Sequence, residues 1–271
     1  SLGNPKLDVV DLESISTLAK EAKVPFIVDN TVATPYLLNP IKFGANIVIH
    51  STTKYINGNG TALGGIIIDA GNFDWSSGLF DEFTEPSAGY HGLVYHDVLG
   101  PAAFIAKVRI EGLRDLGSAP SPFNCFQTIQ GLETLSVRIK QHSKNALKVA
   151  EWLEKQSQVA WVNYPGLKSS KYYDLSQKYL KDGQSGIVTF GLKGGFDSAK
   201  KLTDSTKIFS LLANFGDSKS LIIHPSSTTH QQLNDEQQKS TGVTSDLVRL
   251  SIGLEDPDDL IDDLKNAIKS V

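Results

Sequence analysis

Several kinds of residue are scarce or missing in this chain of 271 residues. Cys125 is the only cysteine, so neither an intramolecular disulfide nor a cysteine-based zinc cluster can form. No apolar run approaches the roughly 20 residues that a membrane-spanning helix needs. The net charge of −4 gives no reason to expect nucleic acid or an anionic membrane as a partner. Methionine is absent too.

What remains is the composition of an ordinary globular protein. Hydrophobic residues make up 40% of the chain and charged residues 21%. The length allows a substantial core and is sufficient for two domains. Cys125 lies at the start of a helical pattern, where a small packed thiol is expected. We therefore expect a reducing, cytoplasmic setting.

The first part of the chain has the pattern of an α/β sheet. Residues 8–23 show helical spacing of apolar side chains, and short runs rich in Val and Ile follow at 25–28 and 46–50. A third run at 63–69 comes after a glycine-rich turn. Such runs are typical of buried strands, so we expect a mostly parallel sheet covered by helices.

Two reactive side chains follow these predicted strands. Asp29 ends the first run and Lys54 comes just after the second, so both should face one crevice beyond the carboxyl ends of the strands. A lysine amine can condense with an aldehyde cofactor, and a carboxylate can keep a pyridine nitrogen protonated. Ser51 and Thr53 offer hydroxyls to a phosphate. This combination suggests a pyridoxal phosphate site; an exposed turn with a helix-capping Asp29 is the structural alternative.

The second part of the chain has a different character. A long helical pattern begins at about residue 123, and predicted strands follow at 159–164, 186–191, 220–224 and 247–252. Helical patterns separate them, which indicates a smaller α+β domain. We place the domain boundary near Pro122, giving a first domain at 1–122 and a linking helix with a second domain at 123–271.

Arg249 lies in the middle of the last predicted strand, between apolar neighbours. A buried arginine must find an anion, and its planar guanidinium suits the α-carboxylate of an amino acid. The alternative is a structural ion pair with an acidic residue between Glu255 and Asp263.

An aromatic segment at residues 71–100 is too apolar for a disordered linker, so it should pack against something. Its two histidines, His91 and His96, lack a third ligand at supporting spacing. We therefore expect no metal site.

Sequence motifs across the whole chain resemble the Cys/Met-metabolism family of pyridoxal phosphate enzymes. Seven stretches occur in the family's order. They are SLGNP at 1–5, VDNT at 28–31, HSTTKY at 50–55, SPFN at 121–124, QGLETL at 130–135, HPSSTTH at 224–230 and VRLSIGLED at 248–256. The resemblance implies the C-terminal half of a fold-type I transferase large domain, followed by a small α+β domain.

The resemblance also implies roles for individual residues. Lys54 would bind pyridoxal 5'-phosphate covalently and then act as the general base. Asp29 would hold the ring nitrogen, Ser51 and Thr53 would bind the phosphate, and Asn4 would bond the ring oxygen. Arg249, assisted by Asn214, would hold the substrate carboxylate.

Within the family, GYHGLVY at 89–95 and the segment around it are most similar to the O-acetylhomoserine sulfhydrylase branch. That branch exchanges the acetate of O-acetylhomoserine for sulfide. A cystathionine γ-synthase, a γ-lyase and a non-catalytic half-chain are the alternatives. Asn59 stands where the branch commonly has histidine, so any role of that histidine is missing.

The family's N-terminal half, with further cofactor ligands, has no counterpart in the stretches recognised above. We expect a complementing polypeptide or chain segment and a homo-oligomer, a dimer of dimers. The other expected partners are the amino-acid ester and sulfide, with no nucleic acid and no membrane.

Overall fold

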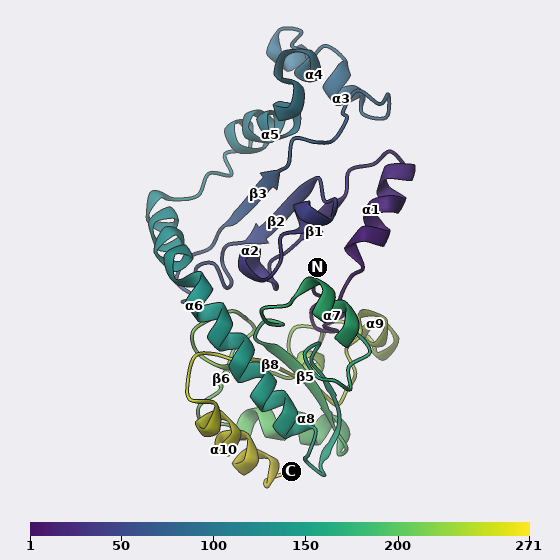
Figure 1. Cartoon of the computed structure of the whole chain (residues 1–271). Coiled ribbons are helices and arrows are strands. Elements are labelled where there is room, and N and C mark those ends of the chain that lie inside the picture. Colours follow the sequence, from purple (N-terminus) through teal and green to yellow (C-terminus); the bar gives the residue numbers. More distant parts are fainter.

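A computed structural model describes all residues from Ser1 to Val271. It shows a small sheet in the upper part of the molecule, a larger sheet below it and a long helix, α6, that runs beside both (Figure 1). The elements of the first part are α1 (Leu12–Glu21), β1 (Ile27–Asp29), α2 (Thr34–Leu37), η1 (Pro40–Phe43), β2 (Ile47–Ser51) and β3 (Gly65–Asp69).

The small sheet has the order β1-β2-β3 and mixed strand directions. β1 and β2 are parallel, with Ile27 opposite Ile47, whereas β2 and β3 are antiparallel, with Ser51 opposite Gly65. The expected parallel arrangement is therefore present in the first strand pair and absent in the second. Residues 52–64 reverse the chain without a crossover helix, and a parallel third strand would have required such a crossover.

The aromatic segment packs against itself and against the small sheet. Trp75 stacks on Phe104 at 5.2 Å between ring centroids, and it forms a buried cluster with Phe83, Tyr95 and Ile47 of β2. No group of His, Cys, Asp and Glu side chains could hold a metal ion. The elements here are α3 (Asp81–Thr84), η2 (Ala88–Tyr90), α4 (Tyr95–Leu99), η3 (Gly100–Ala102), α5 (Ala103–Lys107) and the π-helix η4 (Val108–Asp115).

Helix α6 (Pro122–Leu153) links the two parts. It begins with Pro122 in its first turn, and the Ser121 hydroxyl accepts a hydrogen bond from the backbone of Asn124. Leu135 and Ile139 pack into the core beneath the small sheet, and Leu153 packs into the core of the larger sheet. The division at residue 122 stays a proposal, which the start of α6 supports.

The larger sheet has the order β4-β5-β8-β7-β6. Its strand pairs are antiparallel except for β6 with β7, and α6, α8 and α10 pack on it (Figure 1). The elements are β4 (Val159–Asn163), α7 (Tyr173–Tyr179), β5 (Ile187–Leu192), α8 (Gly195–Ser205), β6 (Ser210–Leu211), β7 (Leu221–Ile223), η5 (Pro225–Ser227), α9 (Asp235–Thr241), β8 (Leu247–Ser251) and α10 (Pro257–Ile268). None of the helices combines the length and the apolar character that spanning a membrane requires.

Candidate active site

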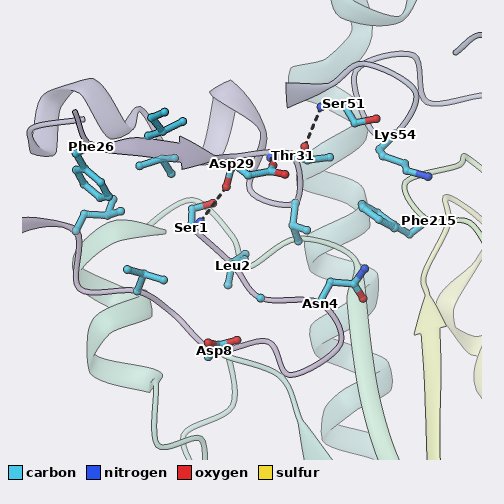
Figure 2. Close-up of a pocket in the computed structure, with 16 residues that line it drawn as sticks. Ser1, Leu2, Asn4, Asp8, Phe26, Asp29, Thr31, Ser51, Lys54 and Phe215 are labelled. Carbon is cyan, nitrogen blue, oxygen red and sulfur yellow. Dashed lines mark hydrogen bonds between the residues drawn. The ribbon is translucent and has the colours of Figure 1, made fainter. Parts of the chain in front are cut away.

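A cavity of about 550 Å³ lies where the small sheet meets the N-terminal segment. Figure 2 shows Asp29, Thr31, Ser51 and Lys54 along one side, with Leu2, Asn4 and Asp8 across from them. The lining residues are Ser1, Leu2, Gly3, Asn4, Asp8, Val10, Leu12, Phe26, Ile27, Val28, Asp29, Thr31, Val32, Ser51, Lys54 and Phe215.

Asp29 and Lys54 reach this cavity from neighbouring strands. Asp29 is the last residue of β1, and β2 ends at Ser51, three residues before Lys54. Because the two strands are parallel, their carboxyl ends lie at the same edge of the sheet. The structure thus brings together Asp29, Ser51, Lys54 and Asn4, which sequence reasoning had chosen from three separate stretches.

Thr31 connects the ends of the two strands. Its backbone N–H donates to Asp29 Oδ1 at 2.9 Å, and its hydroxyl accepts from the backbone N–H of Ser51 at 2.8 Å. These bonds hold one Asp29 oxygen in place and leave the other without a protein partner. Sequence reasoning missed Thr31, although it ends the VDNT motif, because its role depends on a strand pairing that one stretch cannot reveal.

The amine of Lys54 lies in a partly buried corner. Its Nζ donates to Asn214 Oδ1 at 2.6 Å and lies 5.0 Å from the centroid of the Phe215 ring. Burial lowers the pKa of Lys54, and the positive charge of Arg249 lowers it further. A larger share of this amine is therefore neutral and nucleophilic near neutral pH than in an ordinary exposed lysine.

Arg249 is buried at the end of the same corner, with 9% of its surface exposed. Nη1 donates to Asn4 Oδ1 at 3.1 Å and Nη2 to the backbone oxygen of Asn214 at 3.0 Å, whereas Nε has no partner. Burial lowers the pKa of Arg249 to about 10.

Arg249 forms none of the chain's ion pairs, so the alternative of a structural pair with residues 255–263 is wrong. The nearby acids have other partners: Glu255 accepts from Ser220, and Asp263 accepts from the backbone of residues 207–209. A buried cation with a free donor and no carboxylate suits the carboxylate of a ligand.

Three of the predicted residues, Arg249 among them, do not line the cavity. The Thr53 hydroxyl donates to the backbone oxygen of Gly64 at 3.2 Å and accepts from its N–H at 3.1 Å. Asn214 reaches the site through Lys54 and Arg249 rather than through the cavity wall. The phosphate role of Thr53 stays a prediction, and Ser51, whose hydroxyl has no protein partner, is better placed for it.

Phe215 is a second lining residue that sequence reasoning missed. Its ring lies beneath both cations, 5.0 Å from Lys54 Nζ and 5.9 Å from Arg249 Cζ. A ring face attracts cations, so Phe215 favours this arrangement of two like charges. Its position next to Asn214 in the sequence could have indicated that Phe215 lies near the site. An aromatic residue in a loop is equally compatible with ordinary packing.

A family model described as Cys/Met metabolism PLP-dependent enzyme matches residues 1–269. The chain belongs to this family. The family resemblance found in the sequence motifs is thereby confirmed.

Named relatives of this chain are sulfhydrylases. The O-acetyl-L-homoserine sulfhydrylase of Leptospira meyeri is 54% identical over 280 residues, covering 100% of this chain and 63% of that protein. The O-acetyl-L-homoserine sulfhydrylase 1 of Thermus thermophilus is 48% identical, covering 99% of this chain and 64% of that protein. The chain therefore spans a little under two thirds of the length of these relatives.

A solved structure shares the fold. The putative O-acetylhomoserine (thiol)-lyase of Campylobacter jejuni superposes with a TM-score of 0.95 at 46% identity, covering 99% of this chain and 64% of that one. That structure carries an N'-pyridoxyl-lysine-5'-monophosphate. The expected α/β fold of the fold-type I enzymes is confirmed.

The residues of the Cys/Met-metabolism site fit pyridoxal 5'-phosphate, the family's cofactor. The cavity offers a lysine amine of lowered pKa, a carboxylate oxygen of Asp29 without a protein partner, and the unpaired hydroxyl of Ser51. These groups match the aldehyde, the ring nitrogen and the phosphate of the cofactor.

Replacing Arg249 with Gln should raise the pKa of Lys54, because the substitution removes the nearby positive charge that disfavours the protonated amine. The midpoint of Lys54 acylation against pH, followed by peptide mass spectrometry in the cofactor-free chain, is expected to move to higher pH. Labelling of Lys148, which pairs with Asp258 on the surface, is the control and should not change. An unchanged Lys54 midpoint would contradict the coupling.

Proposed function

We propose that this protein is a pyridoxal phosphate-dependent enzyme that exchanges the acetate of O-acetylhomoserine for sulfide, producing homocysteine. The observation that carries the proposal is the placement of Lys54 and Arg249 on either side of Asn214, next to the cavity that contains Asp29. An amine and a carboxylate-binding group at this spacing suit an α-amino acid. The names of the relatives support the choice of substrate.

Arg249 would bind the substrate carboxylate. Its Nε has no partner, and Asn4 and the backbone of Asn214 fix the orientation of the guanidinium through its other two nitrogens. The ion pair between Arg249 and the substrate carboxylate would form in a poorly solvated part of the site, where a bidentate contact is strong and directional. The substrate would therefore arrive with its α-carbon beside Lys54.

Lys54 would serve first as the covalent attachment point and then as the proton carrier. When bound, pyridoxal phosphate supplies an aldehyde that captures amino groups and a ring that accepts electrons. Asp29 would hold the ring nitrogen protonated. Once substrate has displaced it, the Lys54 amine would remove the proton from the α-carbon, aided by its lowered pKa. A further proton loss at Cβ would release acetate from Cγ. Sulfide would then add at Cγ, and the return of protons to Cβ and Cα would give homocysteine.

We further propose that another polypeptide segment completes the cofactor domain. β1 and β3 are edge strands with one partner each, and Ile27, Ile49 and Ile67 are exposed on the sheet face that carries Asp29. An exposed apolar sheet face with open edges is suited to packing against more protein. The greater length of the relatives agrees with this. A purified 271-residue chain that binds cofactor and turns over substrate unaided would rule the requirement out.

An assembly of several copies, a dimer of dimers, is part of the same proposal. The first half of α6 exposes Phe123, Phe126, Ile129 and Leu132 at regular spacing, with between 50% and 66% of each exposed. Large apolar side chains in a row are typical of interfaces.

The free thiol of Cys125 supports a cytoplasmic location.

In the complete, cofactor-loaded enzyme, Lys54→Ala should abolish the covalent link and lower kcat by roughly 10²–10⁴-fold, because both attachment and proton transfer are lost. Borohydride reduction followed by peptide mass spectrometry should find the adduct on the peptide containing Lys54 in the parent protein and nowhere in the variant. Lys148→Ala, which removes only a surface ion pair, should leave both measurements unchanged. An adduct on another lysine would refute the assignment.

Product analysis separates the family's reactions. The complete enzyme is supplied with O-acetylhomoserine together with sulfide, with cysteine or with neither. We expect homocysteine and acetate from the sulfide reaction as the fastest turnover. Faster formation of cystathionine from cysteine would instead identify a γ-synthase, and release of a keto acid and ammonia without a thiol would identify a γ-lyase.

A further inference from the structure

Helix α6 carries three buried polar side chains on one face: Arg138, His142 and Asn145. Their spacing of four and three residues places them one above another along the helix. Apart from two contacts of Arg138 and one of Asn145, which accepts from Gln141, all within α6 itself, every hydrogen bond they make is to a backbone oxygen in another part of the chain. These three residues are called the α6 ladder below.

The top of the α6 ladder holds the segment that follows Lys54. Arg138 Nη1 donates to the oxygen of Tyr55 at 2.8 Å, and Nη2 donates to that of Ile56 at 3.2 Å. Its remaining bonds return to α6 itself, at Gly131 and Thr134. Arg138 pairs with no carboxylate, so the cost of burying its charge is offset by these carbonyl oxygens.

The lower part of the ladder holds the end of the strand that carries Arg249. His142 Nδ1 lies 2.7 Å from the oxygen of Ile252. Asn145 Nδ2 donates to the oxygens of Gly253 and Glu255 at 3.1 and 2.9 Å. Because β8 ends at Ser251, these bonds fix the first residues beyond the arginine strand.

The loop with Asn214 is held between these two segments. The backbone of Ser218 donates to the oxygen of Gly58 at 2.8 Å, and the N–H of Gly216 donates to the hydroxyl of Ser251 at 3.0 Å. A Cβ at Gly216 would lie 2.6 Å from the backbone nitrogen of Tyr55. The backbones of these two segments are therefore too close for a side chain at position 216. The same side of α6 touches the Lys54 loop at Gly131, where a Cβ would lie 2.3 Å from the oxygens of Ile56 and Asn57.

We propose that the α6 ladder is a positioning element that sets the spacing between the Lys54 amine and the Arg249 guanidinium. Arg138 would fix the amine end, and Asn145 with His142 would fix the carboxylate-binding end. The roles of Lys54 and Arg249 rest on the proposed function; the mechanical part of the inference does not. A misplacement of about 1 Å between reacting groups can cost about 10²-fold in rate, so such an element has a measurable effect.

The test compares Arg138→Met, Asn145→Ala and a control, Ser176→Ala, in the complete, cofactor-loaded enzyme. Methionine keeps much of the volume of arginine and removes its donors. Ser176 is as deeply buried and donates to the oxygen of Pro165, far from the ladder's targets in sequence, so its loss reports a general cost of removing a buried hydrogen bond.

Hydrogen exchange measures the mechanical part without any turnover. In Arg138→Met, the amides of Asn57 and Gly58 should exchange about tenfold faster, while the peptide around residues 252–255 changes little. Asn145→Ala should show the reverse pattern. Ser176→Ala should change neither. Exchange at Asn57 and Gly58 that matches the control, or rises equally over the whole chain, would overturn the proposal.

Kinetics then separate the two ends of the ladder. Arg138→Met should lower kcat about tenfold or more with little change in KM, and Asn145→Ala should mainly raise KM for the amino acid. If Arg138→Met does not fold, Arg138→Lys makes the same comparison with the parent protein. Lysine keeps the charge but has fewer donors, so exchange at Asn57 and Gly58 should still be faster, and kcat lower, than in the parent. If both variants lower kcat and raise KM by the same factors, the assignment of Arg138 to the amine end and of Asn145 to the carboxylate-binding end is wrong. If the complete parent enzyme shows no turnover, the proposed function is wrong. Hydrogen exchange alone then tests whether the α6 ladder holds the two segments.

Discussion

Two cations share one residue at the centre of this molecule. The side-chain oxygen of Asn214 accepts from Lys54, and its backbone oxygen accepts from Arg249, while no carboxylate pairs with the arginine. Like charges in a poorly solvated corner raise each other's free energy, which is why Arg249 contributes to the lowered pKa of Lys54. The charge of an anionic ligand, as in the proposed function, would relieve that repulsion.

The surrounding fold keeps these charged groups apart from one another and close to the cavity. The parallel pairing of β1 with β2 delivers Asp29 and Lys54 to one edge, and Thr31 links the two strand ends. Arg249 arrives from a different sheet, in the middle of a strand that is buried along its whole length. Helix α6 is in contact with both regions, as the proposed positioning role requires.

Much of the site could be predicted because its chemistry depends on residue type and on the ends of strands. An acid after one apolar run and a lysine after the next indicate a shared crevice, and an arginine inside an apolar strand indicates a bound anion. The family motifs then assigned the cofactor. The direction of β3, the parts played by Thr31 and Phe215, and the bonding of Thr53 to Gly64 could not be predicted in this way. Each depends on which backbone lies opposite, and that is a property of the packed chain.

Local chemistry and pattern in the sequence alone thus indicated the type of fold and identified Lys54, Asp29 and Arg249 as candidate site residues. Tertiary structure decided against a structural ion pair for Arg249, because only packing shows that Arg249 pairs with no carboxylate and that Glu255 and Asp263 accept from other groups. It also decided which groups the polar residues in α6 contact. In the fold their donors meet backbone oxygens more than 80 residues away. Contacts at that separation follow from the way the whole chain packs, which no short stretch of residues encodes.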